Sequence, residues 1–128
     1  AFDSSPFSFE SHQRWYQEKL ISSDYLILIV WQNETAIACV RYERLASGTI
    51  EVHLALAPVA WGQGIGTEAL KQTLAVAYRR FKCPDVIAHI LPEHQSSRRA
   101  FQKAGYEFDT NTEFKGCRVE RWKVATPI

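Results

Sequence analysis

An excess of charge of one sign is missing from this chain, because its 15 lysines and arginines nearly balance its 14 aspartates and glutamates and the net charge is +1. Such a balance gives no electrostatic reason to expect a nucleic acid or a membrane surface as a partner. Long apolar runs are missing as well. No stretch approaches the roughly 18 residues of a membrane span, and a secretory signal is not expected.

Cysteine is scarce and methionine is absent. The three cysteines, Cys39, Cys83 and Cys117, are odd in number, and their wide spacing matches no metal site. This pattern favours reduced, mostly buried thiols in a cytoplasmic protein, and it predicts no bound metal. At 128 residues the chain is expected to form one domain that buries roughly two-thirds of its unfolded surface.

Glycine is also rare, yet three of the six glycines, Gly62, Gly64 and Gly66, stand at alternate positions of one loop. Before them, residues 50–57 alternate strictly between apolar and other side chains, which indicates a half-buried strand, and Pro58 stops its ladder. A helical pattern follows the glycines. A glycine loop between a strand and the start of a helix is suited to hold phosphate oxygens.

Three kinds of phosphate-binding loop fit this arrangement. A Walker loop is excluded because Gly66 is followed by Thr67 and not by Lys with Ser or Thr. A dinucleotide loop fits in spacing, since Gly64, Gly66 and Ala69 match G-x-G-x-x-A. Glu93, roughly 20 residues further on, would be the acidic residue of that motif. The motif, however, opens directly after its strand and needs further strand–helix units, and the chain ends 35 residues after Glu93.

The third kind is the acetyl-CoA loop of the GNAT N-acetyltransferases, which residues 56–66 (LAPVAWGQGIG) resemble. The pattern of that family is Gln/Arg-x-x-Gly-x-Gly/Ala, and Gly64 and Gly66 match it. Gly62 is common beside them. Trp61 stands at the Gln/Arg position, which is a departure. The resemblance implies that backbone N–H groups of this loop hold the pyrophosphate of coenzyme A.

A second block, residues 91–106, resembles the following GNAT motif, Asn-x-x-Ser-x-x-x-Tyr/Phe-x-x-x-Gly-Phe/Tyr. Ser97, Phe101, Gly105 and Tyr106 fall in register, and His94 stands where Asn is usual. Two such blocks, in this order and about 30 residues apart, are much more specific than either one. The resemblance covers roughly residues 25–124.

The resemblance implies an α/β (α+β) GNAT fold whose mixed sheet has helices on both faces. An antiparallel meander of three strands, Tyr25–Trp31, Thr35–Leu45 and a strand over 50–57, precedes the loop. A helix with Leu70, Leu74, Ala77 and Phe81 on one face and a strand over residues 85–91 then complete a parallel crossover. A helix over residues 96–104 and a final hairpin, residues 106–109 and 117–125 around a turn at 111–116, complete the chain.

In that fold the two crossover strands splay apart after a bulge, and the pantetheine arm of acetyl-CoA lies between them. The expected cofactor contacts are therefore Leu54, Ala55, Leu56, Trp61, Gly62, Gln63, Gly64, Ile65, Gly66, Thr67, His94, Ser97 and Phe101. His94 either braces the loop or donates a proton. Phe101 replaces a Tyr that many members use to protonate the departing thiolate, so it is expected to pack against the pantetheine.

Glu51 and His53 are the candidate catalytic residues. They stand at i and i+2 on one face of the strand that receives the thioester, and a base is needed because an alkylamine is mostly protonated at neutral pH. The alternative is that both simply occupy a polar sheet face. A backbone N–H near Leu56 would polarise the carbonyl. His89, on an apolar strand, is expected to be a satisfied sheet residue and not a catalyst.

The start of the chain is the least diagnostic part. Ser8 is a suitable N-cap for a helix to about Ile21, and residues 8–15 resemble GNAT enzymes that act on nucleotide-linked amino sugars. Either Trp15 and Leu20 dock this helix on the sheet, or His12 and Trp15 line an acceptor pocket. The absence of methionine and the start at Ala1 favour a trimmed single domain or part of a longer chain, with the first strand missing. A sheet edge left unpaired in this way invites association, so a homodimer is one expectation.

The sequence therefore predicts an acetyl-CoA-dependent N-acetyltransferase that acts on a primary amine of a small molecule or amino sugar, in the cytoplasm, with no metal, nucleic acid or membrane involved. Two alternatives stay open. One is a CoA-binding domain without catalysis, which the departures at Trp61, His94 and Phe101 favour. The other is acetylation of a protein or peptide amine.

Overall fold

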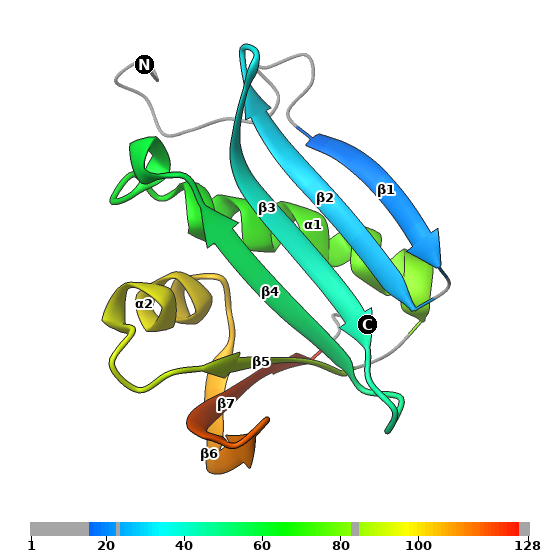
Figure 1. The fold of residues 1–128 in the computed structure, drawn as a ribbon, viewed down its shortest axis with the longest axis vertical. Helices are drawn as coiled ribbons and strands as arrows, with labels where there is room; N and C mark the ends of the chain where they lie inside the picture. Colours follow the sequence, from blue (N-terminus) through cyan, green and yellow to red (C-terminus); the bar gives the residue numbers. More distant parts are fainter. Residues whose placement is uncertain (1–15, 23, 83–84, 126–128) are drawn as a thin grey trace.

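The computed structural model describes residues 16–22, 24–82 and 85–125. It contains a seven-stranded sheet in the order β1-β2-β3-β4-β5-β7-β6, with α1 lying across one face (Figure 1). Its strands are β1 (Tyr16–Ser22), β2 (Tyr25–Gln32), β3 (Thr35–Arg44), β4 (Ile50–Leu56), β5 (Asp85–Ile90), β6 (Glu107–Phe114) and β7 (Cys117–Ala125). Its helices are α1 (Ile65–Phe81) and α2 (Gln95–Lys103), with a short 3-10 turn over Pro58–Ala60.

The predicted meander and crossover are confirmed. β2, β3 and β4 pair antiparallel in sequence order, and β4 pairs parallel with β5 after α1. Apolar side chains at alternate positions of these strands face α1, whose own inner face includes Leu70, Leu74, Ala77 and Phe81. The core between sheet and helix fixes α1 and therefore the loop before it.

The pairing of β4 with β5 is short. It includes only Ile50 with Val86 and Glu51 with Ile87, so the two strands separate after Glu51, as expected for a splay. The expected bulge is wrong, because the register of β3 and β4 runs without a shift from Arg44 opposite Ile50 to Ala38 opposite Leu56. The splay arises because β5 turns toward β7, with which it pairs over its whole length.

The predicted N-terminal helix is wrong where it can be compared. Residues 16–22 form the edge strand β1, which pairs antiparallel with β2 through a tight hairpin. Without it, the outer N–H and C=O groups of β2 would lack partners, and that need outweighs helix propensity. Ser8, His12 and Trp15 lie outside the described residues.

Two smaller expectations also need correction. The β6–β7 turn is only Lys115 and Gly116, so β6 extends through the segment expected to be a loop. Cys117 is exposed and Cys39 half-buried, and both are free thiols, while Cys83 lies outside the described residues. Within the part of the chain that the structure describes, neither helix combines the length and apolarity required to cross a membrane.

Candidate active site

A cavity of about 660 Å³ opens where the glycine loop, the end of β4 and the start of α2 meet. Nine of the expected cofactor residues line it, seven from the two sequence motifs and two from beside the first motif: Leu56, Trp61, Gly62, Gly64, Gly66, His94 and Ser97, with Leu54 and Thr67. The two blocks of sequence that are about 30 residues apart therefore form one site in space.

The glycines give the loop its shape. Gly62 and Gly64 have φ values of 72° and 75°, which side chains rarely adopt. Gly66 has another reason, because a Cβ there would come within 3.1 Å of Leu54 Cδ2 and 3.2 Å of Leu56 Cδ1. The loop thus turns twice and then brings α1 close against β4.

Four residues of the loop and of the first turn of α1, Gly62, Gly64, Gly66 and Thr67, line the cavity. Among the residues that the structure describes, no backbone acceptor is recorded for the N–H groups of residues 62–67, and the first helical bond runs from Glu68 N to Gly64 O at 3.1 Å. The N–H of Trp61 differs from the expectation, since it donates to Pro58 O at 3.1 Å. Amides without a backbone acceptor next to a helix N-terminus form a site suited to a phosphate group.

The open edge of β4 supplies the other wall. Ala57 N donates to Ile37 O across the β3–β4 ladder at 2.9 Å, so by the alternation of an antiparallel pair the N–H and C=O groups of Leu54 and Leu56 point away from β3. They face the side on which β5 no longer pairs with β4. Ala55, another expected cofactor contact, alternates with them and points its backbone groups to β3.

Three further expected residues lie away from the cavity. The side chain of Gln63 donates to Val59 O at 2.8 Å, and Ile65 is fully buried in the core. Phe101 is also a core residue, 4% exposed, with its ring edge-on to Tyr106 at 5.0 Å. Phe101 was expected to pack against the pantetheine, but α2 turns this side chain inward.

Sequence reasoning missed two cations, Arg99 and Lys103, that line the cavity. Together with Ser96 and Ala100 they form one face of α2, at i, i+3, i+4 and i+7. That periodicity was visible in the sequence. It could have shown that the face carrying Ser96 and Lys103 differs from the face that buries Phe101.

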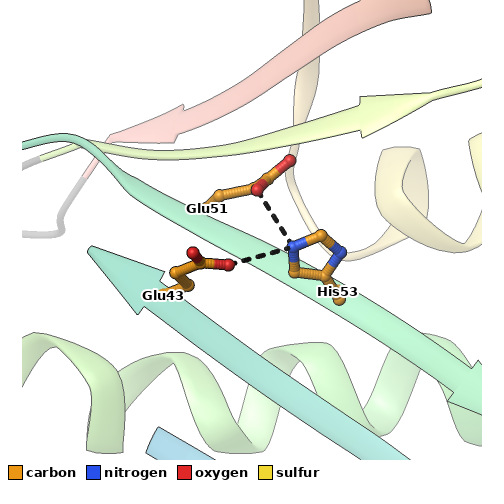
Figure 2. A group of neighbouring side chains, drawn as sticks. All are labelled: Glu43, Glu51 and His53. Atoms are coloured by element: carbon orange, nitrogen blue, oxygen red, sulfur yellow. Dashed lines mark hydrogen bonds and ion pairs between the residues drawn. The ribbon is translucent and has the colours of Figure 1, made fainter. Parts of the chain in front are cut away.

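The candidate catalytic residues Glu51 and His53 lie on the opposite face of β4 from Leu54, as strand alternation requires. His53 Nε2 lies 3.0 Å from Glu51 Oε1 and 3.9 Å from Glu43 Oε1, and the other ring nitrogen of His53 faces away from both carboxylates (Figure 2). Glu51 is 1% exposed. Glu51 thus lies on a polar face of the sheet, as the alternative states, but it is buried there.

Glu51 has a second partner from a distant strand. His89 on β5 places Nδ1 2.5 Å from Glu51 Oε2, so the expectation of a satisfied sheet residue is correct but incomplete. Burial by itself raises the pKa of Glu51, but the hydrogen bonds and charges of His53 and His89 outweigh burial, and its pKa is lowered. The carboxylate is therefore ionised at neutral pH and can only accept, so the ring nitrogens that face it carry protons.

This arrangement leaves His53 Nδ1 as a proton acceptor on a half-exposed ring. A buried carboxylate that fixes one imidazole nitrogen and leaves the other basic is a usual arrangement for proton transfer. Glu43, Glu51 and His53 also place three ligand atoms within 4.8 Å of one another. A cation there would have to displace the His53 hydrogen bond to Glu51.

The comparisons with known proteins agree with this geometry. The sequence model of the acetyltransferase (GNAT) domain matches residues 2–107. AAC(6')-Ib in complex with ribostamycin and coenzyme A superposes with a TM-score of 0.71 at 13% identity, over 80% of this chain and 65% of that one. The same enzyme has also been solved with acetyl-CoA.

Two further structures have the same fold. The GNAT domain of S. lividans PAT has a TM-score of 0.71 at 26% identity, over 81% of this chain and 62% of that one. Spermidine N-acetyltransferase SpeG of Vibrio cholerae has a TM-score of 0.69 at 14% identity, over 80% and 66%. The chain thus spans slightly less than two-thirds of the length of these three proteins. Because the family match covers most of its residues, with the loop, the splay and the second motif in place, the chain belongs to the GNAT acetyltransferase domain family.

Proposed function

We propose that this protein transfers the acetyl group of acetyl-CoA to a primary amine of a small molecule. The observation that carries the proposal is one cavity that lies between the glycine loop, whose amides have no backbone acceptor, and the unpaired backbone edge of β4. A thioester substrate with a diphosphate and an amide-rich arm needs these two surfaces in series.

The residues present fit that substrate. The amides of residues 62–67 and the positive end of α1 suit the diphosphate, and Arg99 and Lys103 add positive charge at the same cavity. The backbone groups of Leu54 and Leu56 can pair with the amides of the arm as a neighbouring strand would. The Leu56 N–H is a donor for the thioester carbonyl oxygen, where negative charge develops.

His53 and Glu51 supply the proton chemistry. An amine of ordinary pKa near 10.4 is mostly protonated at neutral pH, which costs about 4–5 kcal/mol before attack is possible. His53 Nδ1 takes the amine proton, directly or through water, while Glu51 holds the ring and stabilises its charged form. The amine nitrogen then bonds to the carbonyl carbon, the C–S bond breaks, and the thiolate leaves.

The leaving thiolate has no hydroxyl partner at position 101. Phe101 carries no hydroxyl, and its ring is in the core. A thiol of ordinary pKa near 8.5 is only about 2 kcal/mol from its thiolate at neutral pH, so a water molecule suffices as proton donor.

The acceptor class follows from the relatives by analogy. One similar protein was solved with an aminoglycoside and another is a spermidine N-acetyltransferase, and both acceptors are small amines. An amine panel should therefore contain spermidine, an aminoglycoside, a nucleotide-linked amino sugar and lysine peptides. Release of free thiol from acetyl-CoA, with the acetylated product identified by mass, tests the proposal.

The expected result is turnover with at least one small amine and a loss on the order of 10² or more in kcat for His53→Ala. Binding of acetyl-CoA by calorimetry without turnover on any amine would instead establish a CoA-binding domain. Turnover restricted to the peptides would establish acetylation of a protein or peptide amine.

A further inference from the structure

Glu51 is held from two strands that otherwise separate beside it. Its Oε1 accepts from His53, two residues along β4, and its Oε2 accepts from His89 on β5. β4 and β5 have their last paired residues at Glu51 and Ile87, and His89 is the next residue of β5 on the same face. The carboxylate therefore bridges the two strands where the splay begins.

His89 is itself fixed. Its side chain is 9% exposed, and its ring stacks on Phe114 of β6 with centroids 4.0 Å apart and planes 11° from parallel. On the other side of β5, β7 is paired along the whole strand, with Arg121 opposite His89. A ring held by a stacked neighbour and a paired strand is a rigid donor.

We propose that His89 is a positioning residue for acetyl transfer, because it fixes one oxygen of Glu51 so that the other oxygen keeps His53 oriented toward the acceptor amine. This inference rests on the proposed function. The physical reason is geometric. A carboxylate bonded at one oxygen alone can rotate about its last side-chain bonds, whereas donors on both oxygens from two different strands leave one orientation.

The buried carboxylate also needs the second donor. Burying an ionised group without full hydrogen bonding is unfavourable, and removal of one partner leaves the buried charge without full compensation. On β3, the charged residues Glu43 and Arg41 lie opposite Glu51 and His53 in the ladder, and on β7 Lys123 and Arg121 lie opposite Ile87 and His89. Arg121 on β7 is paired with Asp109 at 2.7 Å. His89 and His53 are thus the donors recorded for Glu51 among the described residues.

Two variants separate positioning from packing. His89→Leu fills the space but has no donor. His89→Asn is the matched control, because its side-chain amide nitrogen stands at the same bond separation from Cβ as the imidazole Nδ1. We expect His89→Leu to lower kcat on the order of tenfold while KM for acetyl-CoA stays within about twofold, since an interaction used only in the chemical step affects kcat. His89→Asn should recover most of that loss.

A spectroscopic measurement gives an independent readout. The carboxyl carbon of Glu51, followed by NMR as a function of pH, should titrate at higher pH in His89→Leu than in wild type, because one donor to the charged form is gone. In His89→Asn it should titrate near the wild-type position. A packing defect elsewhere would not move this one resonance in that order.

Several outcomes would overturn the proposal. An unchanged kcat in His89→Leu, equal losses in the Leu and Asn variants, or an unchanged Glu51 titration would each do so. If His89→Leu does not fold, His89→Asn and the wild-type imidazole ¹⁵N signals decide, because a His89 Nδ1 without a bound proton at neutral pH contradicts the assigned hydrogen bond. Wild-type protein that binds acetyl-CoA but acetylates no amine refutes the proposed function itself. A normal wild-type turnover with an unaffected His89→Leu refutes only this inference.

Discussion

Glu51 shows how a single residue depends on its neighbours. Its carboxylate is almost fully buried, and a charge in that position is stable only while His53 and His89 donate to it. Removing the charge and removing a partner are therefore different experiments. The first, as in Glu51→Gln, keeps one acceptor oxygen and places an amide donor against the other histidine, and the second leaves the charge uncompensated.

The pH dependence of stability follows from the lowered pKa of Glu51. A group with a lower pKa in the folded chain binds fewer protons there, so stability rises with pH. This contribution is complete above the ordinary carboxyl value of 4.5 and is lost as pH falls below it through the lowered value. Between about pH 6 and about pH 3, wild type should lose more unfolding free energy than Glu51→Gln in denaturant titrations.

The control for this measurement is Glu107→Gln, which changes an exposed carboxylate. It should lose stability with acid in parallel with wild type. If Glu51→Gln also ran parallel to wild type, the two histidine bonds would not be stabilising the ionised form.

Gly66 is a residue where stability and binding should separate. An added Cβ crowds Leu54 and Leu56, but both leucines border the cavity and can turn into it. Alanine also improves helix propensity by about 1 kcal/mol. We expect Gly66→Ala to change the unfolding free energy by less than about 1 kcal/mol and to weaken CoA binding on the order of tenfold by calorimetry, about 1.4 kcal/mol.

Gly64→Ala is the contrasting variant. Its Cβ would meet nothing within 4 Å, but φ is +75°, which costs about 1–2 kcal/mol for a residue with a side chain. Its main effect should be on the unfolding free energy. Unchanged CoA affinity in Gly66→Ala would mean that the leucines do not border the occupied part of the cavity.

Tyr42 and Thr73 form a buried pair that ties β3 to α1. The hydroxyl oxygens are 2.7 Å apart, and Thr73 Oγ1 donates to Ala69 O at 2.7 Å, so Tyr42 donates to Thr73. Thr73→Val leaves the Tyr42 hydroxyl buried without an acceptor and should cost about 1–3 kcal/mol of unfolding free energy. Tyr42→Phe should cost about 1 kcal/mol.

The double variant tests the pair directly. Because both changes remove the same hydrogen bond, the loss in Tyr42→Phe/Thr73→Val should be smaller than the sum of the single losses by about 1 kcal/mol. Additive losses would show that the two hydroxyls act independently.

Among the elements, β4 has an unpaired edge, and a side chain of the protein itself hydrogen-bonds to part of this edge. The indole N–H of Trp61 donates to Leu56 O at 3.3 Å, and that carbonyl faces the side where the substrate arm is proposed to pair. The indole, 64% exposed, therefore competes with any ligand donor. Trp61→Phe keeps an aromatic ring and removes the donor, so CoA should bind about two- to fivefold more tightly, the equivalent of about 0.5–1 kcal/mol.

Calorimetry on Trp61→Phe distinguishes two roles of this residue, which departs from the family pattern. Tighter binding identifies the indole as a competitor for the β4 edge. Weaker binding by a similar factor would show that the indole contacts the bound cofactor, as the usual side chain at this position is expected to do.

The elements differ in how far sequence could predict them. The meander, α1, β5 and α2 follow from local periodicity, because alternation or a helical stripe marks the buried face. β1 and the long β6 do not have such marks. Their strand pairing with β2 and β7 is a tertiary effect that a residue-by-residue reading of 8–21 or 111–116 does not contain.

The candidate site was predictable to a similar degree. The glycine loop and the pair Glu51 and His53 lie within one stretch of the sequence, so local patterns alone were sufficient to identify them as candidates. His89 is 38 residues from Glu51, and only the parallel crossover brings it to that carboxylate. The prediction for Phe101 was wrong for another reason. A motif position fixes where a residue lies along a helix, but it does not fix which face of the helix lines the cavity.

At the scale of the whole molecule, the sheet separates two tasks. The cavity of loop, β4 edge and α2 lies on the face that carries Leu54 and Leu56, and the cluster of Glu51, His53 and His89 lies on the other face of the same strands. The two faces are connected where β4 and β5 separate. Substrate binding and proton transfer should therefore respond to different substitutions.

Ligand-linked stability tests this separation. A ligand at 100 times its Kd adds about 2.7 kcal/mol to a fold that binds it only when folded, which corresponds to a rise of roughly 10 °C in Tm for a chain of this size. Saturating CoA should raise Tm by the same amount in wild type and in Glu51→Gln, although their Tm values without ligand differ and kcat falls in the variant. A smaller shift in Glu51→Gln would mean that the cluster takes part in binding CoA, and no shift in either protein would mean that the cavity is not its site.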